Sequence, residues 1–537
     1  MRGLGEPGRV LARRGLTASG LVVLGVFLRL DLLKEPAIWL GWNSDSAVFG
    51  LMAKRIRDGT GFDVFFWGQN YLGPLTSALA ALIRRLFLDA SGAGAEAGPL
   101  SLRLACVAEV SFGTVLSFLA FDRLFGYAAA LAGGLWLALS SPVLVRVAAA
   151  PMGPEVSFAL GSIVFYLTAD ALTRSPAALD RAAGRFGLGL AGGIGWWMNP
   201  TVVLVLVPCA LLLVLRSPSY ATLLERVVTG SPGLGDAAKT AMRRLAPVAT
   251  GLAAGTLPVW LGGVLGWYPR AYGFVTPLLP GPGWLHRLGR FFAVDGRRLV
   301  GLDGDLSGGV VYVAGLAGVA LLVVRRRYRL RSLALLTPFP ADGIDLALAV
   351  VATGAWVFTL EERLPGQIRY LAPVLPATLA MASAGAVDAV RRVPGRFLRL
   401  AAALAAGGLA LAGLVVTGRN ADREVSEIRA ERDPRPLLAE IEQGGWSVCH
   451  AGYGIAYKLQ FLSDEQVRFV PFQSQDRNPR ESARLRELPG PQCLVTPEGS
   501  VRGWRPEDAA EEGGPRKRRE AGVRPSTPAS PGRAPSS

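Results

Sequence analysis

The chain has 537 residues, of which 51% are hydrophobic and only 18% are charged, and its net charge is +16. A soluble globular protein usually carries about 25% charged residues, so this composition argues against a soluble enzyme and predicts many membrane spans. The basic residues cluster between apolar runs and do not interleave with aromatic residues on a polar domain, which argues against nucleic-acid binding.

Apolar runs long enough for a helix to cross about 30 Å of hydrocarbon recur along the chain. No convincing small-residue cleavage site follows the first run, so we expect it to be retained as an anchor. The predicted spans cover residues 16–33, 72–88, 100–121, 125–141, 155–173, 186–199, 200–215, 246–267, 306–324, 344–360, 370–390 and 398–417.

Basic clusters mark the inner ends of membrane helices. The clusters expected inside are Arg13 with Arg14, the loop 216–244, Arg325 to Arg331 and Arg391 to Arg399. The segments left outside are 34–71, 268–305, 361–369 and everything after about 418. Twelve spans from an inside N-terminus would end inside, which conflicts with the last basic cluster. Because the segment 122–155 resists assignment, we predict about eleven to thirteen spans.

The composition changes after the last span. We expect a transmembrane domain over 1–418, with its first outer loop at 34–71, and a small α/β domain over 419–500. The second domain is indicated by short β-rich runs that alternate with helices. From 501 to 537 the chain is rich in Pro, Ser, Arg and Glu and is expected to be disordered. The predicted fold class is therefore an all-α polytopic membrane protein with a small outer α/β domain.

The first outer loop contains a lone carboxylate. The stretch GWNSDSAVFGLMAKRIRDG, residues 41–59, places Asp45 just before an amphipathic helix that we expect to lie on the membrane surface. A carboxylate in the first turn of a helix accepts from free N–H groups and is favoured by the helix dipole. On this physics alone, Asp45 is as well explained by helix capping as by catalysis.

Several segments resemble the GT-C superfamily of membrane glycosyltransferases, and within it the family 39 branch of protein O-mannosyltransferases and lipid A aminoarabinose transferases. In that branch an Asp at the end of the first span is followed by D-x-A-x-x-x-x-x-A-R, and this chain has DSAVFGLMAK with Asp45, Ala47 and Ala53. Many relatives carry a second acid after the first, where this chain has Ser46. The other similar segments are PMGPE (151–155), GGIGWWMNP (192–200), IRYLAPVLPATLA (368–380) and AGYGIAYKLQFLSDEQV (451–467).

This resemblance implies an inverting transferase that moves a hexosyl or pentosyl group from a polyprenyl-phosphate carrier to a lipid, glycan or protein acceptor. It implies Asp45 as the general base, which fits a carboxylate within reach of an acceptor hydroxyl. The leaving phosphate needs cationic or polar donors, for which we expect Arg369 and Tyr370. Arg146, Arg270 and His286 are weaker candidates, and a membrane anchor is the alternative role for Arg369. The further substrate-binding candidates are Trp67, Gln69, Tyr71 and Glu155.

No cofactor is predicted. The second acid of the family pattern is absent and no outer Asp and His cluster has metal-ligand spacing, so we expect no metal requirement. The expected location is the cytoplasmic (inner) membrane, with the C-terminal domain on the outer side.

Two other classes of function compete with this hypothesis. A transporter or a flippase for lipid-linked sugars would need internal repeats or ionisable residues at mid-membrane. No convincing repeat is present, and Glu109, inside an apolar run, is the residue that would best suit a transporter. A structural scaffold would leave the Asp45 loop and the outer domain unexplained.

The four cysteines fall into two groups. Cys106 and Cys209 lie in apolar runs and are expected to be core residues, whereas Cys449 and Cys493 lie on predicted strands of the outer domain. If those strands are neighbours in a parallel sheet, the two sulfurs can bridge, and an oxidising compartment would preserve the bond. Strand order does not follow from the sequence, so a bridge and two buried free thiols are both open.

Overall fold

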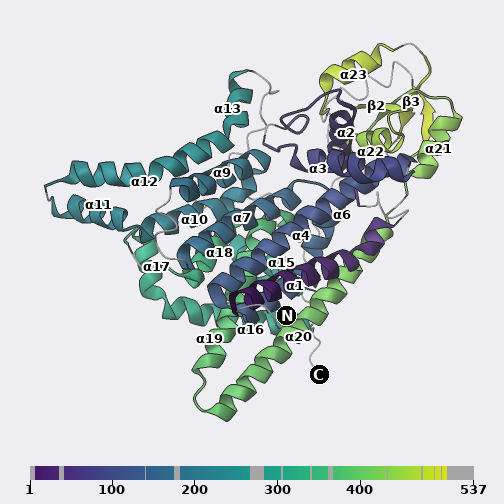
Figure 1. Cartoon of the computed structure of the whole chain (residues 1–537). Coiled ribbons are helices and arrows are strands. Elements are labelled where there is room, and N and C mark those ends of the chain that lie inside the picture. The colour runs from purple at the N-terminus through teal and green to yellow at the C-terminus, as the bar shows by residue number, and fades with distance from the viewer. Residues whose placement is uncertain are drawn as a thin grey trace, which may run out of the picture.

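The computed structural model consists of a large body of helices with a small α/β domain at its C-terminal end (Figure 1). The residues described are 6–504, except for 35–40, 70, 93, 140, 174–181, 231, 266–282, 304–305, 339–340, 361–366, 432, 473–475, 489 and 497–498. The helices of the body are α1 (Glu6–Phe27), α2 (Ser44–Asp58), α3 (Leu75–Ile83), α4 (Ala97–Phe125), α5 (Tyr127–Leu139), α6 (Pro142–Ala149), α7 (Pro154–Thr173), α9 (Ala182–Met198), α10 (Val203–Arg216), α11 (Pro218–Thr229), α12 (Leu234–Gly255), α13 (Leu257–Val264), α14 (Trp284–Arg290), α15 (Gly296–Leu299), α16 (Leu306–Arg325), α17 (Arg327–Ala334), α18 (Gly343–Leu360), the 3-10 helix η8 (Ile368–Val374), α19 (Leu375–Arg392) and α20 (Arg396–Arg429).

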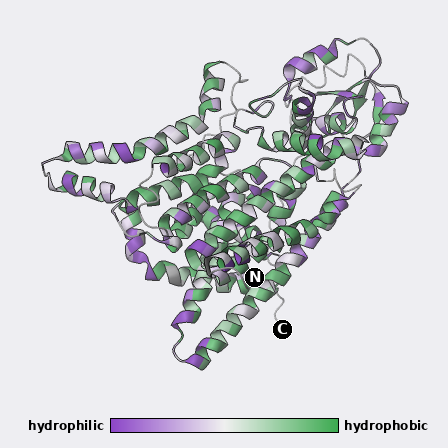
Figure 2. Ribbon diagram, in the orientation of Figure 1, coloured by the Kyte–Doolittle hydropathy of each residue, from purple (hydrophilic) through white to green (hydrophobic). Residues whose placement is uncertain are grey.

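The body has the length and apolarity of a multi-pass membrane protein. In the described part of the chain, seven helices are long and apolar enough to cross a membrane, or ten if each of three bent pairs is one span. Figure 2 shows hydrophobic residues along these helices and hydrophilic residues at many helix ends and in the C-terminal domain.

Two of the expected spans are not among the described helices that meet this length and apolarity test. Two predicted spans, 72–88 and 186–199, correspond to α3 and α9, which have 9 and 17 residues. Both are shorter than the roughly 20 residues that a perpendicular crossing needs. The difficult segment 122–155 contains α5 and α6, a pair bent by 54°.

Helices α9 and α12 pack against each other through glycines. A Cβ added at Gly193 would lie 2.4 Å from the carbonyl oxygen of Leu252, and one at Gly251 would lie 2.2 Å from that of Phe186. Backbones that approach this closely leave room for no larger side chain. The glycines near residue 251 therefore serve close helix packing.

The C-terminal domain is built on a four-stranded sheet of order β2-β1-β3-β4, in which β1 pairs in parallel with both β2 and β3, and β4 is antiparallel to β3. Its sheet and apolar core confirm the predicted α/β character. Strand β4 falls within 501–537, so the sheet extends slightly into the segment expected to be disordered, and 505–537 lies outside the described residues. The elements of this domain are α21 (Arg435–Gln443), β1 (Val448–Ala451), α22 (Tyr453–Leu462), β2 (Arg468–Pro471), α23 (Pro479–Arg486), β3 (Gln492–Val495) and β4 (Val501–Gly503).

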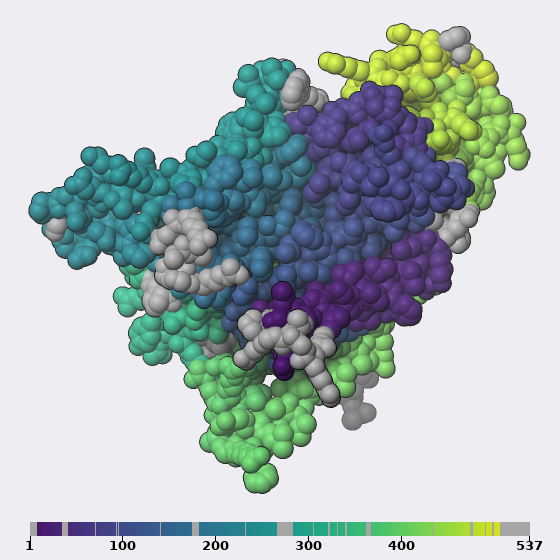
Figure 3. Space-filling view, viewed as in Figure 1, coloured from purple at the N-terminus to yellow at the C-terminus, as the bar shows by residue number. Residues whose placement is uncertain are grey.

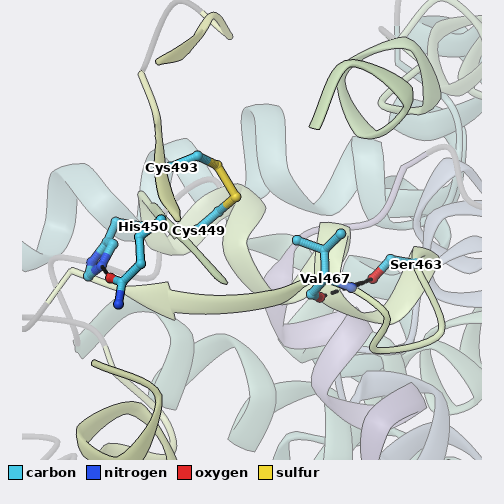
Figure 4. The surroundings of a disulfide bond; sticks show 6 residues. Cys449, His450, Ser463, Val467 and Cys493 are labelled. Atoms are coloured by element: carbon cyan, nitrogen blue, oxygen red, sulfur yellow. Dashed lines mark hydrogen bonds between the residues drawn. A yellow bond between two sulfur atoms is a disulfide. The ribbon is translucent and has the colours of Figure 1, made fainter. Parts of the chain in front are cut away.

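A disulfide bond joins the two central strands of this sheet. Cys449 on β1 and Cys493 on β3 are direct partners in the parallel register, with their Cα atoms 4.4 Å apart (Figure 4). Of the two alternatives that the sequence left open, the structure has the bridge. Cys106 and Cys209 are free and buried, as expected for core residues.

The C-terminal domain is seated on the segment that follows the first helix (Figure 3). Helix α22 packs on α2, and a Cβ added at Gly50 of α2 would lie 2.4 Å from the Phe461 ring of α22. Lys54 pairs with Asp464 at 2.9 Å and Glu465 at 3.1 Å. Helix α2 was expected to lie on the membrane surface, but its residues 46–53 are buried. Its apolar face therefore meets protein.

Replacing Cys449 and Cys493 together with alanine should destabilise the C-terminal domain. The bridge spans a sequence separation of 44 residues, and a loop of this length restricts the unfolded chain enough to contribute about 3–4 kcal/mol. Hydrogen exchange of β1 and β3, followed by mass spectrometry, should become faster in the double variant.

Alkylation of the unfolded but unreduced wild-type protein provides the check on the bridge itself. Cys106 and Cys209 should be modified and serve as internal controls, whereas Cys449 and Cys493 should stay unmodified and appear as a linked peptide pair. Modification of all four cysteines would contradict the bond.

Candidate functional site

The carboxylate of Asp45 is not used to cap α2. The N-cap is Asn43, whose Oδ1 accepts from the backbone N–H of Ser46 at 3.0 Å and from the Ser46 hydroxyl at 3.3 Å. Asn and Asp cap helices about equally well, so a cap placed two residues earlier leaves the Asp45 side chain free. The capping explanation of Asp45 is therefore wrong, and the position of Ser46, where many relatives have a second acid, belongs to the cap.

The free carboxylate points to the C-terminal domain. Its Oδ1 accepts from the hydroxyl of Tyr453 and from Nη2 of Arg477, the latter at 3.2 Å. Both contacts fall on the same oxygen, and Oδ2 accepts no hydrogen bond from any residue described in the structure. The Asp45 side chain is 32% exposed and that of Arg477 is 20% exposed. Asp45 is thus held firmly through one oxygen and is open at the other.

The phenol of Tyr453 lies between these two charges. Arg477 Nε donates to Tyr453 Oη at 3.0 Å, and its guanidinium carbon lies 5.1 Å from the centre of the ring. Burial raises the pKa of Tyr453, and the charge of Asp45 raises it further. The phenol therefore stays protonated and donates to Asp45.

Helix α22 fixes the backbone that presents Arg477. The hydroxyl of Tyr457, one turn after Tyr453, accepts from the N–H groups of Arg477 at 3.0 Å and Asn478 at 3.1 Å, and donates to Asp476 at 3.0 Å. Side chains four residues apart lie on the same helix face. One face of α22 therefore holds both the side chain and the main chain of Arg477.

Gln69 and Tyr71, in the segment between α2 and α3, complete the surroundings of Arg477. With its amide oxygen turned to the guanidinium, Gln69 accepts from Nη2 at 2.8 Å and Nη1 at 3.2 Å and donates to the Tyr71 hydroxyl at 3.2 Å. Burial raises the pKa of Tyr71, as do its neighbours Tyr370 and Asp45, while Arg477 opposes them.

Gly68 lets the loop approach Arg477 closely. Its φ is +69°, and an added Cβ would lie 3.0 Å from Cδ and 3.2 Å from Cα of Arg477. This backbone conformation is strained for residues with a Cβ. Glycine is therefore required here on two independent grounds.

Arg369 lies at the start of η8 beside Tyr370, with its guanidinium carbon 5.4 Å from the Tyr370 ring centre. Its Nη1 is 2.9 Å from the sulfur of Met152, and its buried Nε has no hydrogen-bond partner among the described residues. Arg146, a weaker candidate, pairs with Glu424 at 2.6 Å. No carboxylate among the described residues pairs with Arg369, whose one hydrogen bond there is to a neutral thioether sulfur.

Glu155 does not present a surface to substrate. Its side chain is fully buried and accepts from the N–H of Gly153 at 2.9 Å and from that of Met152 at 3.2 Å. Direct substrate contact, which the sequence suggested, is at odds with this burial. Glu155 instead holds the turn that carries Met152 to Arg369.

Two of the remaining candidates, Trp67 and His286, make no hydrogen bond or ion pair with Asp45 among the described residues. Trp67 donates from its indole to Asp63 at 2.7 Å and stacks under Arg55, so it packs within the loop. His286 is exposed on α14, and Arg270 lies outside the described residues. Across the described ranges, no group of three or more His, Cys, Asp or Glu residues is placed to hold a metal ion.

Two residues of the site were missed by the sequence analysis. Tyr453 lies in the AGYGIAYKLQFLSDEQV segment, which was noted for its aromatic residues but given no role. Arg477 follows in a polar stretch that has no periodicity or spacing to single it out. Its position 432 residues after Asp45 becomes meaningful only once α22 is seen on α2.

Comparison with known proteins relates the fold to two solved enzymes. No protein-family model matches the sequence, and no curated protein is significantly similar to it. The structure is similar to ArnT from Cupriavidus metallidurans in the apo state, with a TM-score of 0.53 and 16% identity over 90% of this chain and 94% of that chain. The undecaprenyl phosphate complex of the same protein gives a TM-score of 0.54 and 15% identity over 89% and 94%.

The structure also resembles an archaeal enzyme. The Archaeoglobus fulgidus oligosaccharyltransferase tethered to an acceptor peptide gives a TM-score of 0.52 and 13% identity over 85% of this chain and 64% of that chain. ArnT and this oligosaccharyltransferase are both GT-C glycosyltransferases. The chain therefore has the GT-C fold that the sequence segments predicted.

Proposed function

We propose that this protein is a membrane glycosyltransferase that moves a sugar from a polyprenyl-phosphate carrier to an acceptor hydroxyl. The main support is the state of Asp45: a carboxylate released from helix capping, held through one oxygen and open at the other. Arg369, with its buried Nε unpartnered by any described residue, lies beside Tyr370. Its Nη1 and the side chain of Asn43, two residues before Asp45, contact the same Met152 sulfur. A base and a cation on a GT-C fold match this chemistry.

In the proposed reaction, the acceptor oxygen attacks the anomeric carbon of the sugar. The bond from that carbon to the phosphate oxygen breaks, and the carrier phosphate leaves with the electron pair. The acceptor proton passes to Oδ2 of Asp45, which becomes a neutral carboxylic acid. Arg369 and the Tyr370 hydroxyl stabilise the charge that grows on the phosphate. Attack opposite the leaving group inverts the anomeric configuration, whether the sugar is a hexose or a pentose.

We place this reaction at the outer face of the cytoplasmic membrane. The Arg-rich turn between α19 and α20 lies at the end of the body opposite the C-terminal domain (Figure 1). Basic turns stay in the cytoplasm, so the C-terminal domain and Asp45 are assigned to the other side. The acceptor is then a lipid, glycan or protein exposed on that side.

The buried carboxyl group of Glu109 is the feature that would best suit a transporter. Its surroundings, however, argue against a transport pathway. Thr76 donates to both of its carboxyl oxygens at 3.1 Å, and its side chain is 5% exposed. A coupling site would need access to water from one side. Glu109 instead belongs to the packing beneath the turn held by Glu155.

Asp45→Asn should abolish most of the transfer activity. Asparagine keeps the side-chain shape and an oxygen for Tyr453, but it is not basic, and loss of general base catalysis costs at least roughly a hundredfold. The measurement is restoration of the glycan or lipid that a deletion strain lacks, followed by the transfer rate of the reconstituted protein.

Asp58→Asn, at the other end of the same helix and paired with Arg57, is the matched control and should keep wild-type activity. Near-normal turnover by Asp45→Asn would refute the proposed function.

Arg369→Ala should weaken binding of undecaprenyl phosphate in lipid nanodiscs more than it weakens binding of the acceptor. Arg369→Lys should recover binding only in part, because lysine lacks the planar fork that fits a phosphate. A membrane anchor behaves differently, since lysine also reaches the interface. Full recovery by lysine, or unchanged binding by the alanine variant, would assign Arg369 to anchoring.

A further inference from the structure

We infer that Tyr453 and Arg477 of the C-terminal domain are positioning residues of the transfer site, which fix Asp45 through Oδ1 so that Oδ2 faces the acceptor. This inference rests on the proposed function and extends it, because it makes the outer domain a working part of the site.

The first support is the asymmetry of the contacts on the carboxylate. Tyr453 and Arg477 both donate to Oδ1, and within the described residues nothing donates to Oδ2. Two donors that converge on one oxygen determine the rotation of the carboxyl group. A base that must take a proton benefits from this, since a misplacement of about 1 Å can cost about a hundredfold in rate.

The second support is that the Arg477 guanidinium is fully committed to this arrangement. Nε donates to Tyr453, Nη2 donates to Asp45, and both terminal nitrogens donate to Gln69. The guanidinium spreads its donors over three nitrogens in fixed directions, which fits three separated acceptors, whereas an ammonium group carries its three donors on one atom. Arg477 therefore sets the relative positions of the helix, the loop and the outer domain around the carboxylate.

The third support is that Arg477 is itself held from outside the site. Tyr457 accepts from its backbone N–H, and Gly68 leaves no room for it to move toward the loop. Segments that precede and follow most of the membrane helices in the sequence thus converge on one guanidinium.

Simple attachment of the domain does not need this contact. Docking is already provided by the Phe461 ring against Gly50 and by Lys54 with Asp464 and Glu465. These contacts lie along α2 and α22, away from the carboxylate at the first turn. The Asp45, Tyr453 and Arg477 group therefore has a separate task, which is orientation of the base.

The test compares Arg477→Ala, Arg477→Lys and Tyr453→Phe with the wild type, each reconstituted in nanodiscs. The matched control is Arg468→Ala. It removes an arginine of the same domain that pairs with Glu481 at 3.3 Å and makes no contact with Asp45, Tyr453 or Arg477 among the described residues. The readouts are kcat and KM for the acceptor, undecaprenyl phosphate binding and the thermal unfolding midpoint.

For Arg477→Ala we expect kcat to fall about 10- to 100-fold with KM, phosphate binding and the unfolding midpoint nearly unchanged. Free guanidinium at millimolar concentration should restore part of kcat, because it can occupy the vacated position. Arg477→Lys should stay well below wild type, Tyr453→Phe should lower kcat several-fold, and Arg468→Ala should match wild type.

Three results would overturn the inference. A kcat within twofold of wild type for Arg477→Ala would show that Asp45 is oriented without it. A raised KM with unchanged kcat would make Arg477 a substrate-binding residue. If Arg477→Ala unfolds, Gly68→Ala takes its place, and wild-type kcat there would count against the inference. Each of these leaves the proposed function standing as long as Asp45→Asn is inactive, so the two ideas fail separately.

Discussion

The packing of α22 on α2 is the contact on which the candidate site depends. It is made by apolar side chains, with Phe461 against the bare backbone of Gly50 and in a stacked contact with Trp42, whose centroid lies 5.8 Å away. Hydrophobic burial has little directional preference, so this contact brings the two domains together without defining their orientation. The hydrogen bonds at the first turn of α2 supply the direction: Asp45 accepts from Tyr453 and Arg477, and the hydroxyl of Ser44 donates to the backbone carbonyl of Tyr453.

Asp45 is available for this arrangement because a neighbouring polar residue caps the helix in its place. Asn43 satisfies the N–H groups at the start of α2, and Asp45 is spared that duty. In the same way, Glu155 is occupied with the turn at Met152 and Gly153, which places the Met152 sulfur against Arg369. A buried polar group without a partner costs free energy, so the polar residues that pair with each other form the structural support of the site. Oδ2 of Asp45 and Nε of Arg369 have no hydrogen-bond partner among the described residues. Under the proposed function, these atoms mark where a substrate would complete the pairing.

The sequence predicts the membrane architecture well because it depends on composition over long windows. Apolar runs and basic clusters identified the helical body, and alternating short runs identified the outer α/β domain. The errors occurred where the outcome depends on one or two residues. The bend between α5 and α6 and the shortness of α3 follow from local breaks that an apolar run does not reveal. The choice of Asn43 over Asp45 as the cap is a competition between two nearly equal residues.

The candidate site was predictable in its chemistry but only partly in its membership. Asp45 and Gln69 both contact Arg477, and Gln69 contacts Tyr71, whereas Tyr370 contacts Arg369. Arg477 could not be found, since nothing in its polar surroundings signals a partner 432 residues away. The bridge between Cys449 and Cys493 was recognisable as a possibility only, because it depends on strand order.

The long separation between Asp45 and Arg477 in the sequence affects when the site can form during synthesis. Translation delivers the carboxylate near the start and its guanidinium partner near the end. A nascent chain that has just completed α20 possesses its membrane helices and its base, yet it lacks Tyr453 and Arg477. In such an intermediate, the Asp45 carboxylate has no partner to orient it. Under the proposed function, the site becomes active only when synthesis is complete and the C-terminal domain has packed onto α2. Unfinished chains in the membrane would then have no transferase activity.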